Sequence, residues 1–212
     1  MKITLFDSEL SKKIAQCLLD VAAIKLQPTD PFTWASGWKS PIYCDNRVSL
    51  SFPQARIVIK NALVRLIQSQ YPEAEAIAGV ATAGIPQGAL VAEALDLPFI
   101  YVRSKSKGHG LANQIEGKVV KGQKVVVLED LVSTGGSSLA AVDALNEAGV
   151  DVLGMTAIFT YAFAKAEENF SEKNVKLVVL SDYPTLLSIS DFDEETRELL
   201  TAWRTAPDTW KQ

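Results

Sequence analysis

Hydrophobic residues follow two different periods along the chain, and these periods predict its secondary structure. From residue 76 onward, short apolar runs alternate with segments in which apolar residues recur at helical spacing. Strands are predicted at 76–81, 98–102, 124–129, 152–160 and 177–180, with helices at 86–95, 137–148 and about 162–170. This alternation predicts an α/β fold in which a parallel central sheet is flanked by helices on both faces.

The two ends of the chain do not follow this alternation. Amphipathic helices are predicted at 8–25 and 53–70, and the polar and aromatic segment 27–50 between them is predicted to be irregular. Asp193 is predicted to cap a last helix. The residues expected on the inner faces of these helices are Leu10, Ile14, Cys17 and Val21, then Ala55, Val58, Ala62, Leu63 and Leu66, and finally Leu199, Leu200 and Trp203.

Composition and charge narrow the class of protein. The chain has 212 residues, of which 48% are hydrophobic and 22% charged, as is typical of one soluble globular domain. A net charge of −4 argues against a nucleic-acid partner, and the lack of a long apolar run argues against a membrane span. The N-terminus lacks the apolar stretch of a signal peptide, and Cys17 and Cys44 do not have metal-site spacing. We therefore expect a cytoplasmic protein with a buried free thiol at Cys17.

The segment 125–138 carries the most specific chemistry in the sequence. Four apolar residues are typical of a buried strand; the acids Glu129 and Asp130 follow, and a loop of small residues leads into a predicted helix. Backbone N–H groups of such a loop can hold a phosphate at the helix N-terminus, and the two acids suit sugar hydroxyls or a metal ion. A site for a phosphorylated sugar is therefore expected. The alternative is an ordinary turn between a strand and a helix.

This strand, acid pair and Thr-Gly-Gly loop resemble the signature by which type I phosphoribosyltransferases bind 5-phosphoribosyl 1-diphosphate (PRPP). The spacing matches neither a Walker loop nor a dinucleotide-binding fingerprint. The resemblance implies the type I phosphoribosyltransferase fold as a single domain, with a core of about 53–190 and a hood made of about residues 1–50 plus the C-terminal helix. It also implies Mg²⁺ as cofactor, with Glu129 and Asp130 holding ribose hydroxyls directly or through the metal. The PRPP-binding residues that it implies here are Glu129, Asp130, Leu131, Val132, Ser133, Thr134, Gly135, Gly136 and Ser137.

The loop 104–118 is longer than a simple crossover needs, which is common for functional loops and also for solvated surface loops. Arg103, Lys107 and His109 resemble the Arg-x-x-x-Lys-x-His lid of the orotate phosphoribosyltransferase branch. In that family the lid closes over the diphosphate, and in the homodimer it closes over the neighbouring subunit's site. The resemblance therefore implies that these cations bind PRPP and stabilise the departing pyrophosphate. Ser104 stands where some members carry an additional lysine, a role that Lys105 could take.

The turn between the first core strand and its helix extends the resemblance. Thr82, Ala83 and Gly84 occupy the positions that hold pyrophosphate in the family. Many members have Tyr-Lys at the first two of these positions, so contacts here must come from the backbone and the Thr82 hydroxyl. A bare structural turn is the alternative.

The segment 32–47 resembles the hood pattern of the orotate branch, Ser-Gly-x-x-Ser-Pro-x-Tyr-x-Asp-x-Arg. Orotate is a flat ring with a carboxylate, which an aromatic wall and a guanidinium can recognise. The resemblance implies orotate contacts from Tyr43, Cys44 and Arg47, together with Ser133 of the loop. Two alternatives stay open. Trp34, Trp38 and Tyr43 can pack the hood on the core, and Arg47 can pair with Asp45 as a structural bridge.

Together these resemblances imply an enzyme of the orotate phosphoribosyltransferase family, which joins orotate and PRPP to give orotidine 5′-monophosphate and pyrophosphate. The resemblance also implies catalytic roles for Lys107, His109 and Asp130, and a homodimer with a shared lid. No nucleophile-and-base arrangement for covalent catalysis is evident. The hood argues against a purine phosphoribosyltransferase. The acidic chain and the lid argue against a PRPP-sensing regulator that binds without turnover.

Overall fold

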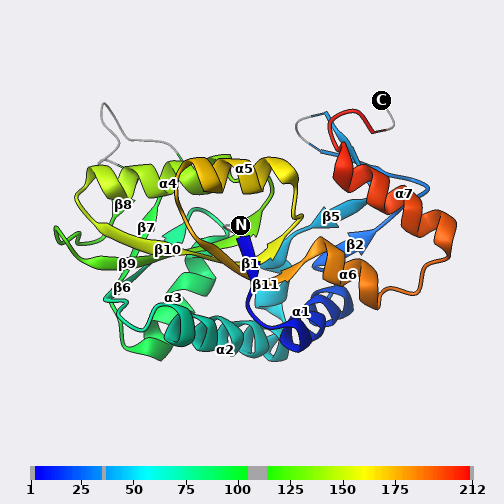
Figure 1. The fold of residues 1–212 in the computed structure, drawn as a ribbon. Coiled ribbons are helices and arrows are strands. Elements are labelled where there is room, and N and C mark those ends of the chain that lie inside the picture. Colours follow the sequence, from blue (N-terminus) through cyan, green and yellow to red (C-terminus); the bar gives the residue numbers. More distant parts are fainter. Residues whose placement is uncertain (1–2, 35–36, 105–113, 211–212) are drawn as a thin grey trace.

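A seven-stranded sheet runs through the middle of the molecule, with helices on both of its faces (Figure 1). The computed structural model describes residues 3–34, 37–104 and 114–210. The strands of this sheet are β1 (Ile3–Leu5), β6 (Ala76–Val80), β7 (Phe99–Val102), β8 (Ile115–Glu116), β9 (Lys124–Val132), β10 (Asp151–Thr160) and β11 (Leu177–Asp182). Their order is β1-β11-β10-β9-β6-β7-β8, and all neighbours are parallel except β7 and β8. The predicted α/β fold with a parallel central sheet is confirmed.

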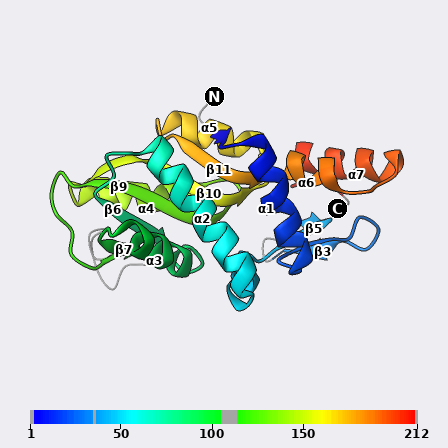
Figure 2. The same cartoon turned by 90° about the horizontal axis from the view of Figure 1, so that it is seen from below.

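Alternating side chains on the strands divide the core into two layers. Along β9, Val126 and Leu128 face the layer that contains α1 (Ser8–Asp20), α2 (Pro53–Gln70) and α3 (Gly84–Leu95). Val125 and Val127 face the opposite layer, which contains α4 (Gly136–Glu147) and α5 (Ala164–Glu172). The view from below shows α1, α2 and α3 across one face of the sheet (Figure 2). The apolar part of β9 is therefore covered on both faces, as expected for a central parallel strand.

A smaller unit, the hood (residues 24–51 and 183–205), lies at one end of the sheet (Figure 1). It contains the strand pairs β2 (Ile24–Leu26) with β5 (Ile42–Cys44) and β3 (Phe32–Thr33) with β4 (Lys39–Ser40), the 3-10 helix η1 (Asn46–Ser51), and the helices α6 (Tyr183–Ile189) and α7 (Glu194–Thr205). Trp203 of α7 is fully buried, with its ring 5.8 Å from that of Trp34, and its indole N–H donates to the backbone oxygen of Lys39. This one side chain therefore joins the C-terminal helix to the β3–β4 pair.

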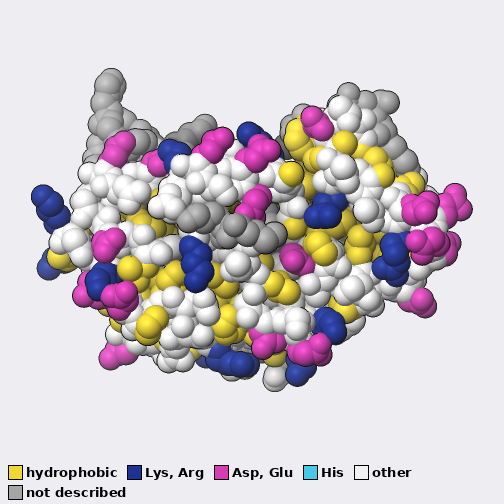
Figure 3. All heavy atoms as spheres, viewed as in Figure 1, with side chains coloured by type: hydrophobic (Ala, Val, Ile, Leu, Met, Phe, Trp, Pro, Cys, Tyr) yellow, Lys and Arg dark blue, Asp and Glu magenta, His cyan; other side chains and the backbone are white. Residues whose placement is uncertain are grey.

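The predicted cap of the last helix is confirmed. The side chain of Asp193 accepts a hydrogen bond from the N–H of Thr196, and Glu194 and Glu195 lie in the first turn of α7. Acidic side chains gather at this end of the molecule (Figure 3). Negative charge at a helix N-terminus is stabilised by the helix dipole, so this cluster has a structural explanation.

Two predictions for the N-terminal part were wrong. The first helix ends at Asp20 rather than at residue 25, because the chain turns through Ala22, whose φ of 54° is left-handed. The following residues form β2, which pairs with β5. The segment 27–50 is accordingly not irregular, since it contains β3, β4, β5 and most of η1.

The predicted inner faces of the helices are mostly correct. Of the residues expected to be buried on α2, only Val58 is exposed, and the neighbouring Ile59 is fully buried instead. Leu200 and Trp203 are buried as predicted, whereas Leu199 is half-buried. Cys17 is also half-buried rather than buried. No helix in the described part of the chain is long and apolar enough to cross a membrane.

The central strand is longer than the predicted 124–129. Pairing of β9 with β10 continues to Leu131 and Val132, which lie opposite Phe159 and Thr160. Glu129 and Asp130 therefore lie inside a strand rather than after one.

Besides β2 to β5 and η1, three elements of the described chain were not predicted: β1, β8 and α6. β1 pairs with β11 at the edge of the central sheet, so residues 3–5 join the core sheet and not a hood of residues 1–50.

Replacing Gly84 by alanine should destabilise the fold, because α3 approaches β9 at this residue. A Cβ atom at Gly84 would lie 2.6 Å from the backbone oxygen of Leu128, which is fixed in the sheet. We expect the free energy of unfolding in urea to fall by about 1–3 kcal/mol. Gly136→Ala is the control, because nothing lies within 4 Å of its Cβ position and the residue is helical. That variant should be unchanged or gain up to about 1 kcal/mol. A Gly84→Ala protein as stable as wild type would contradict this close contact.

Candidate active site

The acid pair lies near the carboxyl end of β9, two residues before the strand ends, in the middle of the sheet. Glu129 is only 6% exposed. One of its carboxylate oxygens accepts a hydrogen bond from the Ser138 hydroxyl at 3.0 Å, and the other accepts from the backbone N–H of Asp130 at 3.1 Å. Because Ser138 belongs to the first turn of α4, this contact fixes the start of the helix relative to the acid pair.

Burial changes the protonation of both acids. It is the largest cause of a pKa of Glu129 well above the usual range, and the nearby Asp130 raises that pKa further. Burial also raises the pKa of Asp130, although a hydrogen bond with the Glu129 side chain acts in the opposite direction. Each acid therefore holds a proton to a higher pH in the free protein than an exposed carboxyl would. A ligand that brings hydroxyl donors or a cation would favour their ionised forms.

The loop after β9 presents backbone N–H groups at the start of α4. Gly135 is the N-cap residue with a φ of 84°, and it offers no side chain to cap the helix. A Cβ atom at Gly135 would lie 2.6 Å from the ring of Phe170, so a larger residue does not fit. The Asn169 side chain donates to the backbone oxygen of Thr134 at 2.8 Å and holds the loop from α5. The arrangement suits an anion bound at the N-terminus of α4.

The turn at Thr82, Ala83 and Gly84 lies beside the acid pair, at Glu129. Gly84 begins α3 and approaches Leu128 and Glu129 closely, which places the turn next to the end of β9. The peptide bond between Ala81 and Thr82 is cis. The structure therefore brings together two segments of the predicted PRPP site that are more than forty residues apart in the sequence.

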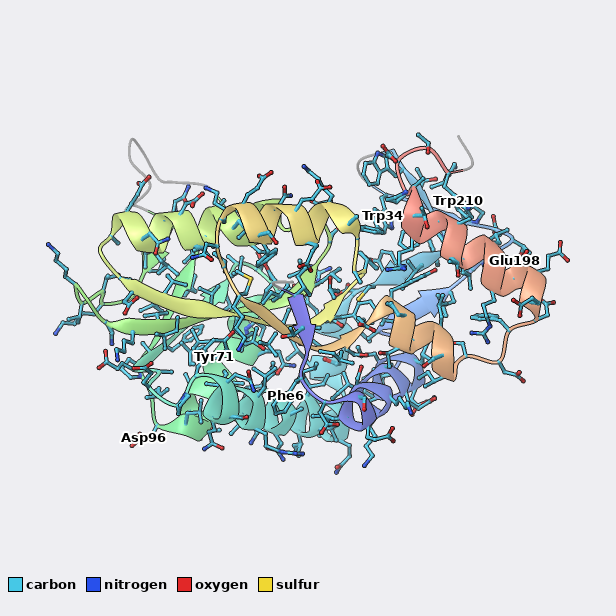
Figure 4. The ribbon with its side chains drawn as sticks, viewed as in Figure 1. Phe6, Trp34, Tyr71, Asp96, Glu198 and Trp210 are labelled. Atoms are coloured by element: carbon cyan, nitrogen blue, oxygen red, sulfur yellow. The ribbon has the colours of Figure 1, made fainter. Side chains whose placement is uncertain are left out.

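A cavity of about 330 Å³ lies between the hood and the loop. It is lined by Thr33, Trp34, Tyr43, Cys44, Leu131, Ser133 and Tyr161. Figure 4 shows Trp34 at the hood end of the molecule, where α7 lies. The Asn46 side chain donates to the backbone oxygen of Asp130 at 2.8 Å and ties η1 to the acid strand. Tyr43, Cys44 and Ser133 of the predicted orotate site thus meet in one cavity of a size typical for small-molecule binding.

Arg47 does not line this cavity. Its guanidinium pairs with Asp45, with Nε–Oδ1 and Nη2–Oδ2 distances of 2.6 and 2.8 Å, and its side chain is 58% exposed. The structural bridge that the sequence left open is therefore present. An orotate contact of Arg47 stays a prediction.

Cys44 is a thiol in the free protein, because burial raises its pKa well above the usual range and Asp130 and Asp45 add to the effect. Its Sγ donates to Asn46 Oδ1 at 3.6 Å.

The predicted lid is only partly described. Arg103 follows β7 and forms an ion pair with Glu116 of β8 at 3.3 Å. Ser104 is also described, whereas Lys105, Lys107 and His109 lie outside the described residues.

A larger cavity of about 580 Å³ lies along β1 and the ends of β10 and β11. Its lining residues include Leu5, Thr160, Phe163, Glu167 and Arg204, and none of the predicted site residues is among them. The smaller cavity is the better candidate, because it adjoins the acid pair and the phosphate loop.

Known proteins share both the sequence and the fold. A family model described as "Phosphoribosyl transferase domain" matches residues 50–185. The orotate phosphoribosyltransferase of Cytophaga hutchinsonii is 53% identical over 206 residues, which cover 95% of this chain and 99% of the relative. That of Porphyromonas gingivalis is 55% identical over 205 residues, which cover 95% and 98%. The chain belongs to the orotate phosphoribosyltransferase family.

A solved structure agrees with this assignment. Orotate phosphoribosyltransferase from Aeropyrum pernix superimposes with a TM-score of 0.74 at 30% identity, covering 82% of this chain and 96% of that one. The predicted enzyme family and the type I phosphoribosyltransferase fold are confirmed. The roles of individual residues stay predictions.

Three residues that contact the site were missed in the sequence. Ser138 directly follows the loop, and its hydrogen bond to Glu129 could have been anticipated from the start of the predicted helix. Tyr161 follows a predicted strand whose carboxyl end lies on the ligand-binding edge of the sheet, which was the available signal. Nothing in the sequence indicated that Asn46 contacts the site, because its hydrogen bond to the backbone of Asp130 joins residues 84 positions apart.

Replacing Glu129 by glutamine should stabilise the folded protein at neutral and alkaline pH. Folding raises the pKa of the Glu129 carboxyl. The folded protein therefore loses stability as pH increases from the unfolded-state pKa of this group to its folded-state pKa, and glutamine, which does not ionise, removes that loss. The variant should melt a few degrees higher than wild type at pH 8, at ~2–4 °C per kcal/mol, and the difference should vanish near pH 4.

Glu147→Gln, on the exposed end of α4, is the control and should leave the melting temperature unchanged. A Glu129→Gln protein that melts lower than wild type at pH 8 would show that the carboxylate is stabilising.

Proposed function

We propose that this protein transfers the 5-phosphoribosyl group of PRPP to orotate, giving orotidine 5′-monophosphate and pyrophosphate for pyrimidine synthesis. The observation that carries the proposal is the cavity in which Tyr43 and Cys44 of the hood meet Ser133 of the phosphate loop. A flat base bound there would lie next to a sugar held at Glu129 and Asp130. The family relationship supports the same reaction.

PRPP is proposed to bind along the ends of β9 and β6. The loop from Leu131 to Ser137 holds the 5′-phosphate through its N–H groups and hydroxyls, and the turn from Thr82 to Gly84 holds the diphosphate. Glu129 and Asp130 accept hydrogen bonds from the ribose hydroxyls. Tyr43, Cys44, Arg47 and Ser133 contact orotate.

The acid pair also suits a Mg²⁺ ion that arrives with PRPP. The described residues contain no cluster of three or more metal-ligating side chains. Mg²⁺ is commonly held by one or two carboxylates, with phosphates and water completing its shell. Glu129 and Asp130 match this pattern. When bound, the ion neutralises charge on the diphosphate.

The proposed reaction is a displacement at C1 of the ribose without a covalent enzyme intermediate. Ionised Asp130 beside the ribose stabilises the positive charge that develops on the sugar. Lys107 and His109, with Arg103 at the start of the lid, stabilise the negative charge on the departing pyrophosphate. A closed lid also keeps water away from the sugar cation.

We further propose a cytoplasmic homodimer in which each lid serves the neighbouring subunit. Two free cysteines suit a reducing compartment. The shared lid follows from the likeness of 103–109 to the family pattern.

Orotate should be the preferred base. Incubation with PRPP and Mg²⁺ should release pyrophosphate rapidly with orotate and at least about a hundredfold less efficiently with uracil, because a site built around a carboxylate rejects an analogue without it. Adenine and hypoxanthine serve as controls for a purine enzyme. Equal kcat/KM for orotate and uracil would contradict the proposal.

Loss of Lys107 should act mainly on the chemical step. Lys107→Ala should lower kcat by about a hundredfold while changing the PRPP KM much less, since the charge that it meets develops in the transition state. Steady-state kinetics with varied PRPP measure both effects. A variant in which only the PRPP KM rises would place Lys107 in ground-state binding.

Mixed dimers test whether the lid is shared. A Lys107→Ala chain and an Asp130→Asn chain should each be nearly inactive, but a heterodimer would contain one site with both residues intact. If subunits exchange freely, activity should recover to about a quarter of wild type. No recovery despite demonstrated exchange would mean that each lid closes over its own subunit.

A further inference from the structure

The three buried tyrosines of the described chain differ in what their hydroxyl groups contact. Tyr71 donates to the backbone oxygen of Met155, and Tyr183 donates to that of Leu200, both at 3.2 Å. Tyr161 is only 3% exposed, yet its hydroxyl has no hydrogen-bond partner among the described residues. The described protein atoms do not fully enclose this hydroxyl. It therefore opens on a space that water can enter.

The ring of Tyr161 is held firmly by other aromatic rings. Its centroid lies 5.3 Å from that of Trp34, 5.4 Å from that of Phe163 and 5.6 Å from that of Trp203. The two indole N–H groups in this cluster are paired, since Trp34 donates to the backbone oxygen of Ile42 and Trp203 to that of Lys39. Within the described part of the chain, the Tyr161 hydroxyl is therefore the one polar atom of this cluster's side chains without a partner, and the packing fixes its position.

The space on which this hydroxyl opens is the cavity between the hood and the loop. Tyr161 lines it together with Ser133 and Cys44. A buried hydroxyl without a partner is costly, and such groups in native proteins commonly meet a ligand or a bound water. A tyrosine used only to pack the cavity wall could be a phenylalanine.

We infer that the Tyr161 hydroxyl donates a hydrogen bond to an acceptor oxygen of the bound pyrimidine and is a specificity-determining residue of the base pocket. This inference rests on the proposed function, because it takes orotate as the occupant of the cavity. Orotate offers two ring carbonyl groups and a carboxylate as acceptors. Adenine has no exocyclic oxygen and offers only ring nitrogens as acceptors, so it cannot make this contact to an oxygen.

The electrostatic environment keeps this hydroxyl a donor. Burial is the largest cause of a raised pKa of Tyr161, and Cys44, Asp130 and Tyr43 raise it further, with a smaller contribution from Tyr183. The group therefore remains an O–H donor at neutral pH.

Tyr161→Phe tests the inference, because it removes the hydroxyl and keeps the packed ring. We expect the orotate KM to rise about tenfold or more, with the PRPP KM within twofold of wild type. The variant should melt at or above the wild-type temperature, since the hydroxyl has no protein partner to lose. Tyr183→Phe is the matched control. It removes a buried hydroxyl that is paired with the backbone, so it should melt lower and leave the orotate KM unchanged.

The outcomes separate the two levels of the account. If the Tyr161→Phe variant turns over orotate as fast as wild type and its orotate KM is unchanged, the role inferred for Tyr161 is wrong. The proposed function would still stand. No turnover of orotate by the wild-type protein overturns the proposed function, and the inference fails with it. If Tyr161→Phe is unstable, the hydroxyl has a structural partner and the inference is also wrong.

Discussion

A pair of neighbouring acids near the end of the central strand, one buried and one partly buried, is the constraint on which the rest of the structure depends. Glu129 is buried, and its oxygens are occupied by the Ser138 hydroxyl and the N–H of Asp130. Burying one acid directly beside another costs free energy that hydrogen bonds offset only in part. The arrangement persists because β9 lies between β6 and β10, with its apolar residues covered on both faces. The core thus stabilises a site that would be unfavourable by itself.

The hood completes the site from the other side. Its attachment depends on a few buried contacts, chiefly the aromatic cluster around Trp203 and the hydrogen bond from Asn46 to the backbone of Asp130. The same cluster forms one wall of the cavity in which the base is proposed to lie, through Trp34 and Tyr161. Packing and recognition therefore use the same side chains, and a change in hood packing would also change the base pocket.

The core could be predicted from the sequence because its signals are local. The apolar run 125–128, the acid pair and the small-residue loop are contiguous, and helix–strand alternation is visible without knowing which strands pair. The hood could not be predicted in the same way. Its strands have two or three residues each, and β2 pairs with β5 across an intervening segment, so no periodic pattern marks them.

The same contrast between local and long-range signals applies to the site. The phosphate loop is a contiguous motif, whereas the base pocket joins residues 33–44, 131–133 and 161, whose proximity is a property of the tertiary structure. Tyr161 illustrates the limit, because its place after a predicted strand puts it at the ligand-binding edge but does not show that it lines the base pocket rather than the core.

A crystal structure of the protein with orotidine 5′-monophosphate tests the central claim most directly, because this product carries the phosphate, the ribose and the base in one molecule. The account predicts the phosphate on the N–H groups of residues 133–137, the ribose hydroxyls against Glu129 and Asp130, and the pyrimidine in the cavity beside Tyr161. A nucleotide bound with its phosphate away from this loop, or in the larger cavity along β1, would contradict it.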